Sequence, residues 1–215
     1  MNFLDLINNV LRRMREDVVT GVHDNRLSSL VSDYVNDAKR QVEDSHDWSA
    51  LHTDLTISTT ADVSEYSLTG SSNRATIIDV RDTTNNQMMT LVPSAYIRKQ
   101  ELVDSPGTTQ PNYYALEGTD SDGDSKIKFW PTPDGAYTIK VHCVLREGDL
   151  VAEGDTTSVP HNPIIMLAHA FAAAERGDVA NMDFSLLVEK ANRALSREIM
   201  LDAAKNPYQM IWTPE

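Results

Sequence analysis

The spacing of the hydrophobic residues changes twice along this chain, and that change constrains the fold more than any single motif. Up to about residue 48, apolar residues recur every three or four positions, as in an amphipathic helix. From residue 53 the spacing falls to two, in short segments rich in threonine, isoleucine, valine and tyrosine, as in antiparallel strands. The helical spacing returns at residue 161. The sequence therefore predicts an α+β protein in which helices flank a β region.

Two helices are predicted before the β region. The first covers roughly residues 3–18, with Asn2 as its cap and Gly21 closing the segment. The second begins near residue 25, and its apolar stripe continues to Trp48.

The histidines around Trp48 raise the question of a catalytic cluster. His46 and Asp47 come just before Trp48, so on a helix they point away from the stripe that Trp48 extends, whereas catalytic partners must converge. Trp48 is therefore predicted to be a buried anchor at a helix end. His46 and His52 are predicted to be ordinary, partly exposed histidines.

Strand signals fill the region from residue 53. In YTIKVHCVL one set of alternate residues is apolar and the other is polar, which predicts a strand with one buried face. The apolar set consists of Tyr137, Ile139, Val141, Cys143 and Leu145. The preceding KIKFWPTPDG is predicted to form a hairpin with this strand through its Pro-Asp-Gly turn. SAYIRKQELVD predicts one short helix capped by Ser94, and residues 146–160 read as a return loop or arm.

Two more helices are predicted after the β region. HNPIIMLAHAFAAAERGD has Asn162 as cap and Gly177 as stop, and its apolar residues predict a helix packed on most sides. The last helix covers about residues 183–204. The economical packing joins both helical pairs into a four-helix bundle with the β region inserted. The predicted parts are an N-terminal helix pair (1–51), an antiparallel β region (52–160), a C-terminal helix pair (161–205) and an extended arm (206–215).

Composition excludes several classes of protein. The chain has 32 acidic and 19 basic residues and a formal charge of -13, which argues against sequence-specific DNA binding. No apolar run approaches the roughly 20 residues of a membrane span, so no membrane partner is expected. The lone Cys143 forms no intramolecular disulfide and reads as a small core residue in a reducing compartment, which points to the cytosol.

Candidate chemical sites are weak. The aspartates of DSDGD, residues 120–124, suggest calcium, but Ser125 and Pro131 stand where a helix-loop-helix calcium loop needs glycine and glutamate. An Asp-Gly hairpin turn between YYALEG and KIKFWP is the preferred interpretation. Nucleophile-elbow, zinc-protease and phosphate-loop motifs are absent from the sequence. The sequence therefore predicts no catalytic residue, no metal site and no cofactor.

The last ten residues carry large apolar side chains that a free monomer would have no evident reason to expose. They carry Tyr208, Ile211 and Trp212, and Pro207 keeps the segment out of a helix. Such a segment either folds back on its own core or docks on a partner, and large aromatic residues are typical interface anchors.

Four segments carry a resemblance to a known family. They are YVNDAKRQVEDSHDWSAL, ADVSEYSLTG, IKFWPTPDGAYTIKVHCVLREGDL and VPHNPIIMLAHAFAAAERGD. In these segments, and in the order of its elements, the chain resembles the head-to-tail adaptors of tailed bacteriophages, including tail-tubular-protein-A-like connectors.

The resemblance implies a virion structural protein and no enzyme. Related adaptors form a ring, dodecameric in relatives, under the portal protein, extend the DNA channel and receive the tail or nozzle protein. Double-stranded DNA would pass through without sequence-specific binding. By the same resemblance Pro207, Tyr208, Ile211 and Trp212 would form a portal-docking arm. The location would be the virion neck, after synthesis in the host bacterial cytoplasm.

A second hypothesis comes from another class of protein. A soluble enzyme or carbohydrate-binding module could use the β region, with Trp130, Tyr113 and Tyr114 as stacking groups and the aspartates of residues 120–124 as polar groups. Such a protein would be a compact monomer that binds a small ligand saturably or turns over a substrate.

Overall fold

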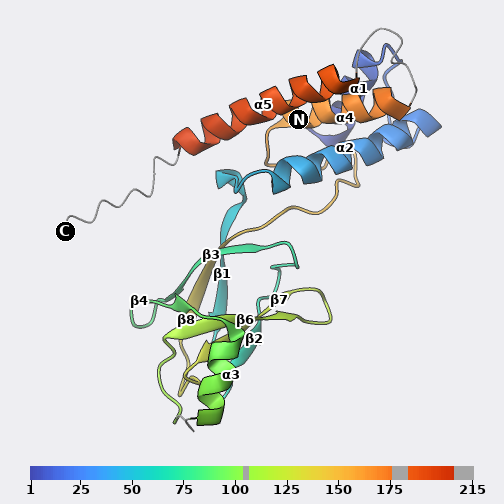
Figure 1. The fold of residues 1–215 in the computed structure, drawn as a ribbon. Helices are drawn as coiled ribbons and strands as arrows, with labels where there is room; N and C mark the ends of the chain where they lie inside the picture. The colour runs from blue at the N-terminus through green and yellow to red at the C-terminus, as the bar shows by residue number, and fades with distance from the viewer. Residues whose placement is uncertain (104–106, 176–183, 206–215) are drawn as a thin grey trace, which may run out of the picture. The chain divides into compact units, whose positions relative to one another are not determined.

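The chain divides into two compact units. The computed structural model describes residues 1–103, 107–175 and 184–205 (Figure 1). The helical unit combines residues 1–51 with the described residues from 147 onward, and the β unit comprises residues 52–146. Helices and strands occur in one α+β chain, as predicted. Residues 147–160, which the sequence grouped with the β region, belong to the helical unit.

The helical unit is built around one central helix. Its elements are α1 (Phe3–Arg13), α2 (Arg26–Asp44), a 3-10 turn η1 (Ser49–Leu51), α4 (His161–Glu175) and α5 (Phe184–Lys205). Helix α4 packs against α1, α2 and α5 (Figure 1). Most of its apolar residues are buried, Met166 and Phe171 are partly buried and Ala174 is exposed, so the prediction of a helix packed on most sides is confirmed.

Helix α1 is shorter than predicted. Its start is correct, because the Asn2 side chain accepts from the Asp5 amide and the Asp5 carboxylate accepts from the Asn2 amide. It ends at Arg13 rather than near residue 18, because Arg15 adopts a positive φ of 61° that turns the backbone out of the helix. Val18, which the apolar spacing placed on the buried stripe, is 58% exposed.

Helix α2 also ends before its apolar stripe does. The helix ends at Asp44, and the chain then turns so that Trp48 lies back against it. Trp48 is 2% exposed, and its Nε1 donates to the Val42 carbonyl at 2.7 Å. The prediction of a buried anchor is therefore confirmed, although Trp48 lies outside the helix. His46 and His52 are partly exposed, as predicted.

The β unit contains two four-stranded sheets. The strands are β1 (His52–Ser58), β2 (Glu65–Ser67), β3 (Thr76–Asp82), β4 (Gln87–Met88), β5 (Thr90–Leu91), β6 (Tyr113–Thr119), β7 (Ser125–Trp130) and β8 (Thr138–Val144). One sheet has the order β1-β8-β3-β4 and the other β2-β7-β6-β5. All pairs are antiparallel except β5 with β6. A fifth helix, α3 (Ser94–Val103), packs on β6 where one short helix was predicted.

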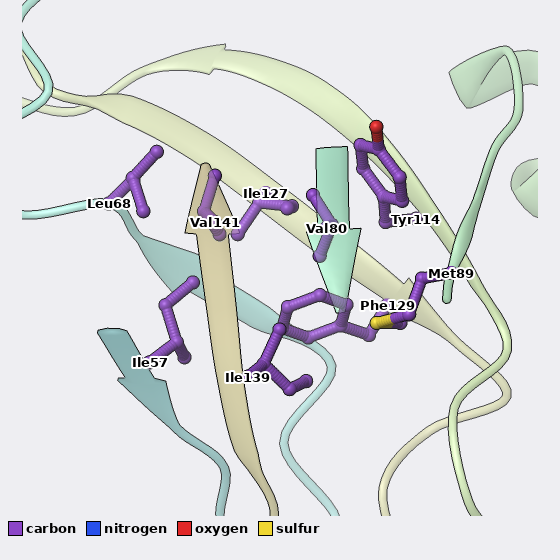
Figure 2. Close-up of a cluster of buried hydrophobic side chains, with 9 residues drawn as sticks. All are labelled: Ile57, Leu68, Val80, Met89, Tyr114, Ile127, Phe129, Ile139 and Val141. Atoms are coloured by element: carbon purple, nitrogen blue, oxygen red, sulfur yellow. The ribbon is translucent and has the colours of Figure 1, made fainter. Parts of the chain in front are cut away.

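The two sheets share one apolar core. Figure 2 shows its nine side chains converging from strands of both sheets and from the ends of β2 and β4. The members are Ile57, Leu68, Val80, Met89, Tyr114, Ile127, Phe129, Ile139 and Val141. Neither sheet buries its apolar face alone, because each face is covered by the other sheet.

The hairpin predicted for β7 and β8 is wrong. These consecutive strands lie in different sheets: β7 pairs with β6 and β2, whereas β8 pairs with β1 and β3. Both strands have one apolar face, and the faces meet across the shared core instead of lying side by side. The alternation predicted within β8 is correct, because Ile139, Val141 and Cys143 are buried.

Candidate interaction surfaces

The residues predicted to dock on the portal are Pro207, Tyr208, Ile211 and Trp212, which lie outside the residues that the structure describes. Their role stays a prediction. The two units offer other candidate sites.

Asp202 near the end of α5 connects that helix to the segment after α2. Its carboxylate accepts from the Ser49 amide at 2.9 Å and from the Ser49 hydroxyl at 2.6 Å, and His46 Nε2 lies 3.4 Å from it. Burial raises the pKa of Asp202, but the Ser49 hydrogen bonds and the charge of Lys205 outweigh burial, so the pKa lies below its ordinary value. The polar cluster near Trp48 therefore has a structural role: it connects α5 to the segment after α2. Its aspartate lies about 150 residues further along the chain, so no local sequence pattern could reveal the contact.

Lys39 holds the return segment onto α2. The side chain is 1% exposed, and its Nζ lies 2.5 Å from the buried Glu43 carboxylate. The same ammonium donates to the backbone carbonyls of Gly148 at 2.9 Å and Glu147 at 3.3 Å. About one turn earlier on α2, the Asn36 side chain donates to the Leu150 carbonyl and accepts from the Leu150 amide. A buried charge with several partners thus fixes residues 147–150 beside α2.

The acidic loop of residues 120–124 is a turn, as predicted. It joins β6 to β7, with Thr119 opposite Ser125. The Asp120 carboxylate accepts from the amides of Asp122 and Asp124, both at 2.9 Å. The Asp124 carboxylate accepts from the amides of Gly70 and Ser72. These oxygens are used by the backbone, and no group of three metal-ligating side chains occurs among the described residues.

The aromatic residues of the alternative carbohydrate-binding hypothesis belong mostly to the core. Trp130 is 7% exposed and packs with Ile97 and Ala115 beneath α3. Tyr114 is 4% exposed and lies in the core shared by the sheets (Figure 2). Tyr113 is half-buried, with its ring centroid 6.0 Å from that of Tyr96. Side chains packed in this way do not offer a stacking platform to a sugar.

A polar cluster that the sequence did not indicate lies on the outer side of the β1-β8-β3 sheet. His142 Nδ1 lies 2.8 Å from the Asp54 carboxylate, and Arg81 donates to the same carboxylate at 3.1 Å. The His142 hydrogen bond, assisted by the charge of Arg81, lowers the pKa of Asp54. The register pairs His142 with Asp54, so this is a cross-strand contact.

A groove lies between α2 and α4 in the helical unit. Its floor includes Tyr34 and Phe171, whose ring centroids are 6.2 Å apart. Asp37, Arg40 and Glu175 also line it, together with Phe184 at the start of α5. The groove therefore combines aromatic surface with two carboxylates and one guanidinium, and that guanidinium is paired with Asp37 and Asp149.

Helix α5 exposes apolar side chains on two sides. Only Leu187 and Ala191 are buried among the apolar residues spaced by three or four positions along it, which are Phe184, Leu187, Val188, Ala191, Leu195 and Ile199. On the outward side, Leu186, Met200 and Leu201 are 41%, 73% and 52% exposed. These residues fall outside the single stripe that the sequence spacing emphasised, so their grouping with the basic residues of the helix was missed.

None of the helices in the described parts of the chain combines the length and apolar character that crossing a membrane requires. Residues 1–210 match the family model described as SU10 adaptor protein. No curated protein matches the chain.

Proposed function

The chain belongs to the SU10 adaptor protein family, and from this premise we propose that it forms a ring between the portal protein and the tail or nozzle protein of a bacteriophage. The ring would extend the DNA channel in the virion neck, after synthesis of the chain in the host cytoplasm. Its role is structural rather than enzymatic. The observation that carries this proposal is the extent of the family match, which spans both units.

The organisation of the helical unit supports a ring subunit. The central α4 contacts α1, α2 and α5, which leaves the outward sides of α2 and α5 for neighbours. We propose that these four helices act as one bundle and that bundles stand side by side around the channel, twelve to a ring. The β unit, with its own core, would contact a partner ring.

The charge of the chain supports passage of DNA without retention. With 32 acidic and 19 basic residues, the subunit carries a formal charge of -13. Acidic groups along a channel repel phosphate, so double-stranded DNA would slide through without sequence-specific contacts. The same charge would keep free subunits apart and soluble until the portal templates the ring.

Residues 206–215 would serve as the portal-docking arm. Tyr208, Ile211 and Trp212 supply the large apolar side chains that anchor interfaces, and Pro207 favours an extended segment.

Mixing the purified chain with portal rings and imaging by negative-stain electron microscopy tests the proposal. We expect additional density on the narrow end of the portal, and we expect a chain ending at Asn206 to fold normally but not to bind. In the full chain, Tyr208→Ala with Trp212→Ala should abolish the density, whereas Gln209→Ala with Thr213→Ala is the matched control. Bare portals beside the full chain contradict the adaptor function. Normal binding by the chain ending at Asn206 contradicts only the arm.

A further inference from the structure

The two flanks of the helical unit carry different surfaces. Helix α4 packs against α2 on one side and α5 on the other, so α2 and α5 are its outer layers (Figure 1). They are similar in length, with 19 and 22 residues, or about 28 and 33 Å at 1.5 Å per residue. Each has an outward stripe of residues spaced by three or four positions, which places them on one side of the helix.

The outward stripe of α5 is apolar at its ends and basic in its middle. We call Leu186, Lys190, Arg193, Arg197, Met200 and Leu201 the α5 stripe. All six side chains are exposed. Arg193 has a local partner in Glu189 at 2.5 Å, which still leaves the stripe with a net positive charge. Leu186 lies at one end of this face and Met200 and Leu201 at the other, so exposed apolar side chains flank the basic residues. A partner helix could bury these apolar ends while an acidic surface meets the basic middle.

The outward stripe of α2 has the opposite charge. We call Leu30, Asp33, Asp37 and Gln41 the α2 stripe, and it runs beside the groove over Tyr34 and Phe171. Arg26 and Asp44 continue the same face at the two ends of the helix with opposite charges, so the face as a whole stays acidic. Both aspartates are exposed. Asp37 also lies 3.1 Å from Arg40, but Asp149 pairs with the same guanidinium and offsets its charge.

Three carboxylates surround Tyr34 at the groove, Asp33 and Asp37 on α2 and Glu175 on α4. Burial raises the pKa of Tyr34, and the charges of Glu175, Asp33 and Asp37 raise it further. Acidic groups from both α2 and α4 therefore act on the floor of the groove. A cationic helix with apolar side chains is the complementary partner for such a surface.

A second copy of the chain supplies that partner. A closed ring uses two different patches on each subunit, and each patch must match the other rather than itself. The α5 stripe and the α2 stripe meet this condition, because they have opposite charge, similar length and positions on opposite flanks of α4. We propose that the α5 stripe of one copy packs on the α2 stripe and aromatic groove of the next. This interface rests on the proposed ring function and assigns its subunit contact.

Charge reversal tests this pairing. In one variant Arg193→Glu and Arg197→Glu make the α5 stripe acidic, and in another Asp33→Arg and Asp37→Arg make the α2 stripe basic. The matched control is Arg12→Glu with Arg13→Glu on α1, two exposed arginines outside both stripes. Circular dichroism and thermal unfolding establish that each variant folds. Complete rings on portals are then counted by negative-stain electron microscopy at equal protein concentration.

We expect each charge-reversed variant to give at least about tenfold fewer complete rings, because like charges then face each other at every subunit contact. The control should match the wild type. A chain with all four substitutions should recover rings to within about twofold, because the charges are exchanged and the pairing is kept. Mixing the two reversed variants should recover rings of even subunit number for the same reason.

The possible outcomes separate this interface from the ring function. Wild-type levels of complete rings from folded, singly reversed variants would overturn the interface and leave the adaptor function standing. So would failure of the folded four-substitution chain to recover rings. Absence of rings with the wild-type chain would contradict the adaptor function and, with it, this interface.

Discussion

Different interactions stabilise the interior of each of the two units. The β unit depends on nine converging apolar side chains from two sheets (Figure 2), and its buried Asp82 accepts hydrogen bonds from the amides of Thr84 and Asn85 in the adjoining turn. The helical unit also buries apolar residues around α4, but its buried Lys39 and Asp202 bond to segments more than 100 residues away in the sequence. Apolar packing is non-directional and distributed over many contacts, whereas a buried charge depends on a few partners. The β unit should therefore respond to lost volume and the helical unit to lost charge.

The largest effect is expected at the centre of the β core. Phe129 is fully buried between the sheets, so Phe129→Ala removes a large side chain and leaves a cavity. We expect the free energy of unfolding of the β unit to fall by about 4 kcal/mol. Urea unfolding followed by circular dichroism measures this change. Leu116→Ala, at a side chain that is 46% exposed, is the control and should change stability by less than about 0.5 kcal/mol.

Removal of one buried charge should rank second. Lys39→Met takes the ammonium away from the Glu43 carboxylate and from two backbone carbonyls. We expect a loss of about 3 kcal/mol in the free energy of unfolding of the helical unit. Lys39→Met combined with Glu43→Leu should recover most of that loss, since no buried carboxylate then lacks its cation. If the double variant is as unstable as the single one, the loss of stability comes from the shape of the Lys39 side chain and not from its charge.

The Asp202 tie should have an intermediate effect. Asp202→Ala removes the acceptor for both hydrogen bonds from Ser49. The expected loss is about 2 kcal/mol, since hydrogen bonds to a charged group contribute more than neutral ones. Chemical denaturation of the full chain measures it. Glu198→Ala, on the same helix, is the comparison that should stay near the wild-type value.

The smallest effect is a pH dependence at the same residue. The folded pKa of Asp202 is lowered, so its ionised form stabilises the fold above its unfolded pKa of about 4, and that contribution is lost as pH falls through the folded pKa. The stability difference between wild type and Asp202→Asn should therefore be about 1 kcal/mol at pH 7 and shrink below about pH 4. A constant difference from pH 7 to pH 3 would exclude the carboxylate charge as its source.

Parts of the candidate surfaces were visible in the sequence and parts were not. Trp48 and Cys143 were recognised as core residues because each continues an apolar pattern. The acidic turn at residues 120–124 was recognised because Asp-Gly is a local turn signal. Asp202 was missed, because the backbone amide it binds belongs to Ser49 and no local spacing connects the two. The α5 stripe was missed because periodicity marks the face that packs inside a chain and does not show what the opposite face contacts.

By itself the sequence determined the α+β class, most helix positions, the alternation within β8 and the large acidic excess, because these depend on residue type and on neighbours two to four positions away. Tertiary structure decided the rest. It set the end of α1 at a backbone turn, separated β7 from β8 into opposite sheets and brought Lys39 to residues 147 and 148. These features depend on which surfaces meet across the fold. Many pairings satisfy the same local pattern, and packing of the whole unit selects one of them.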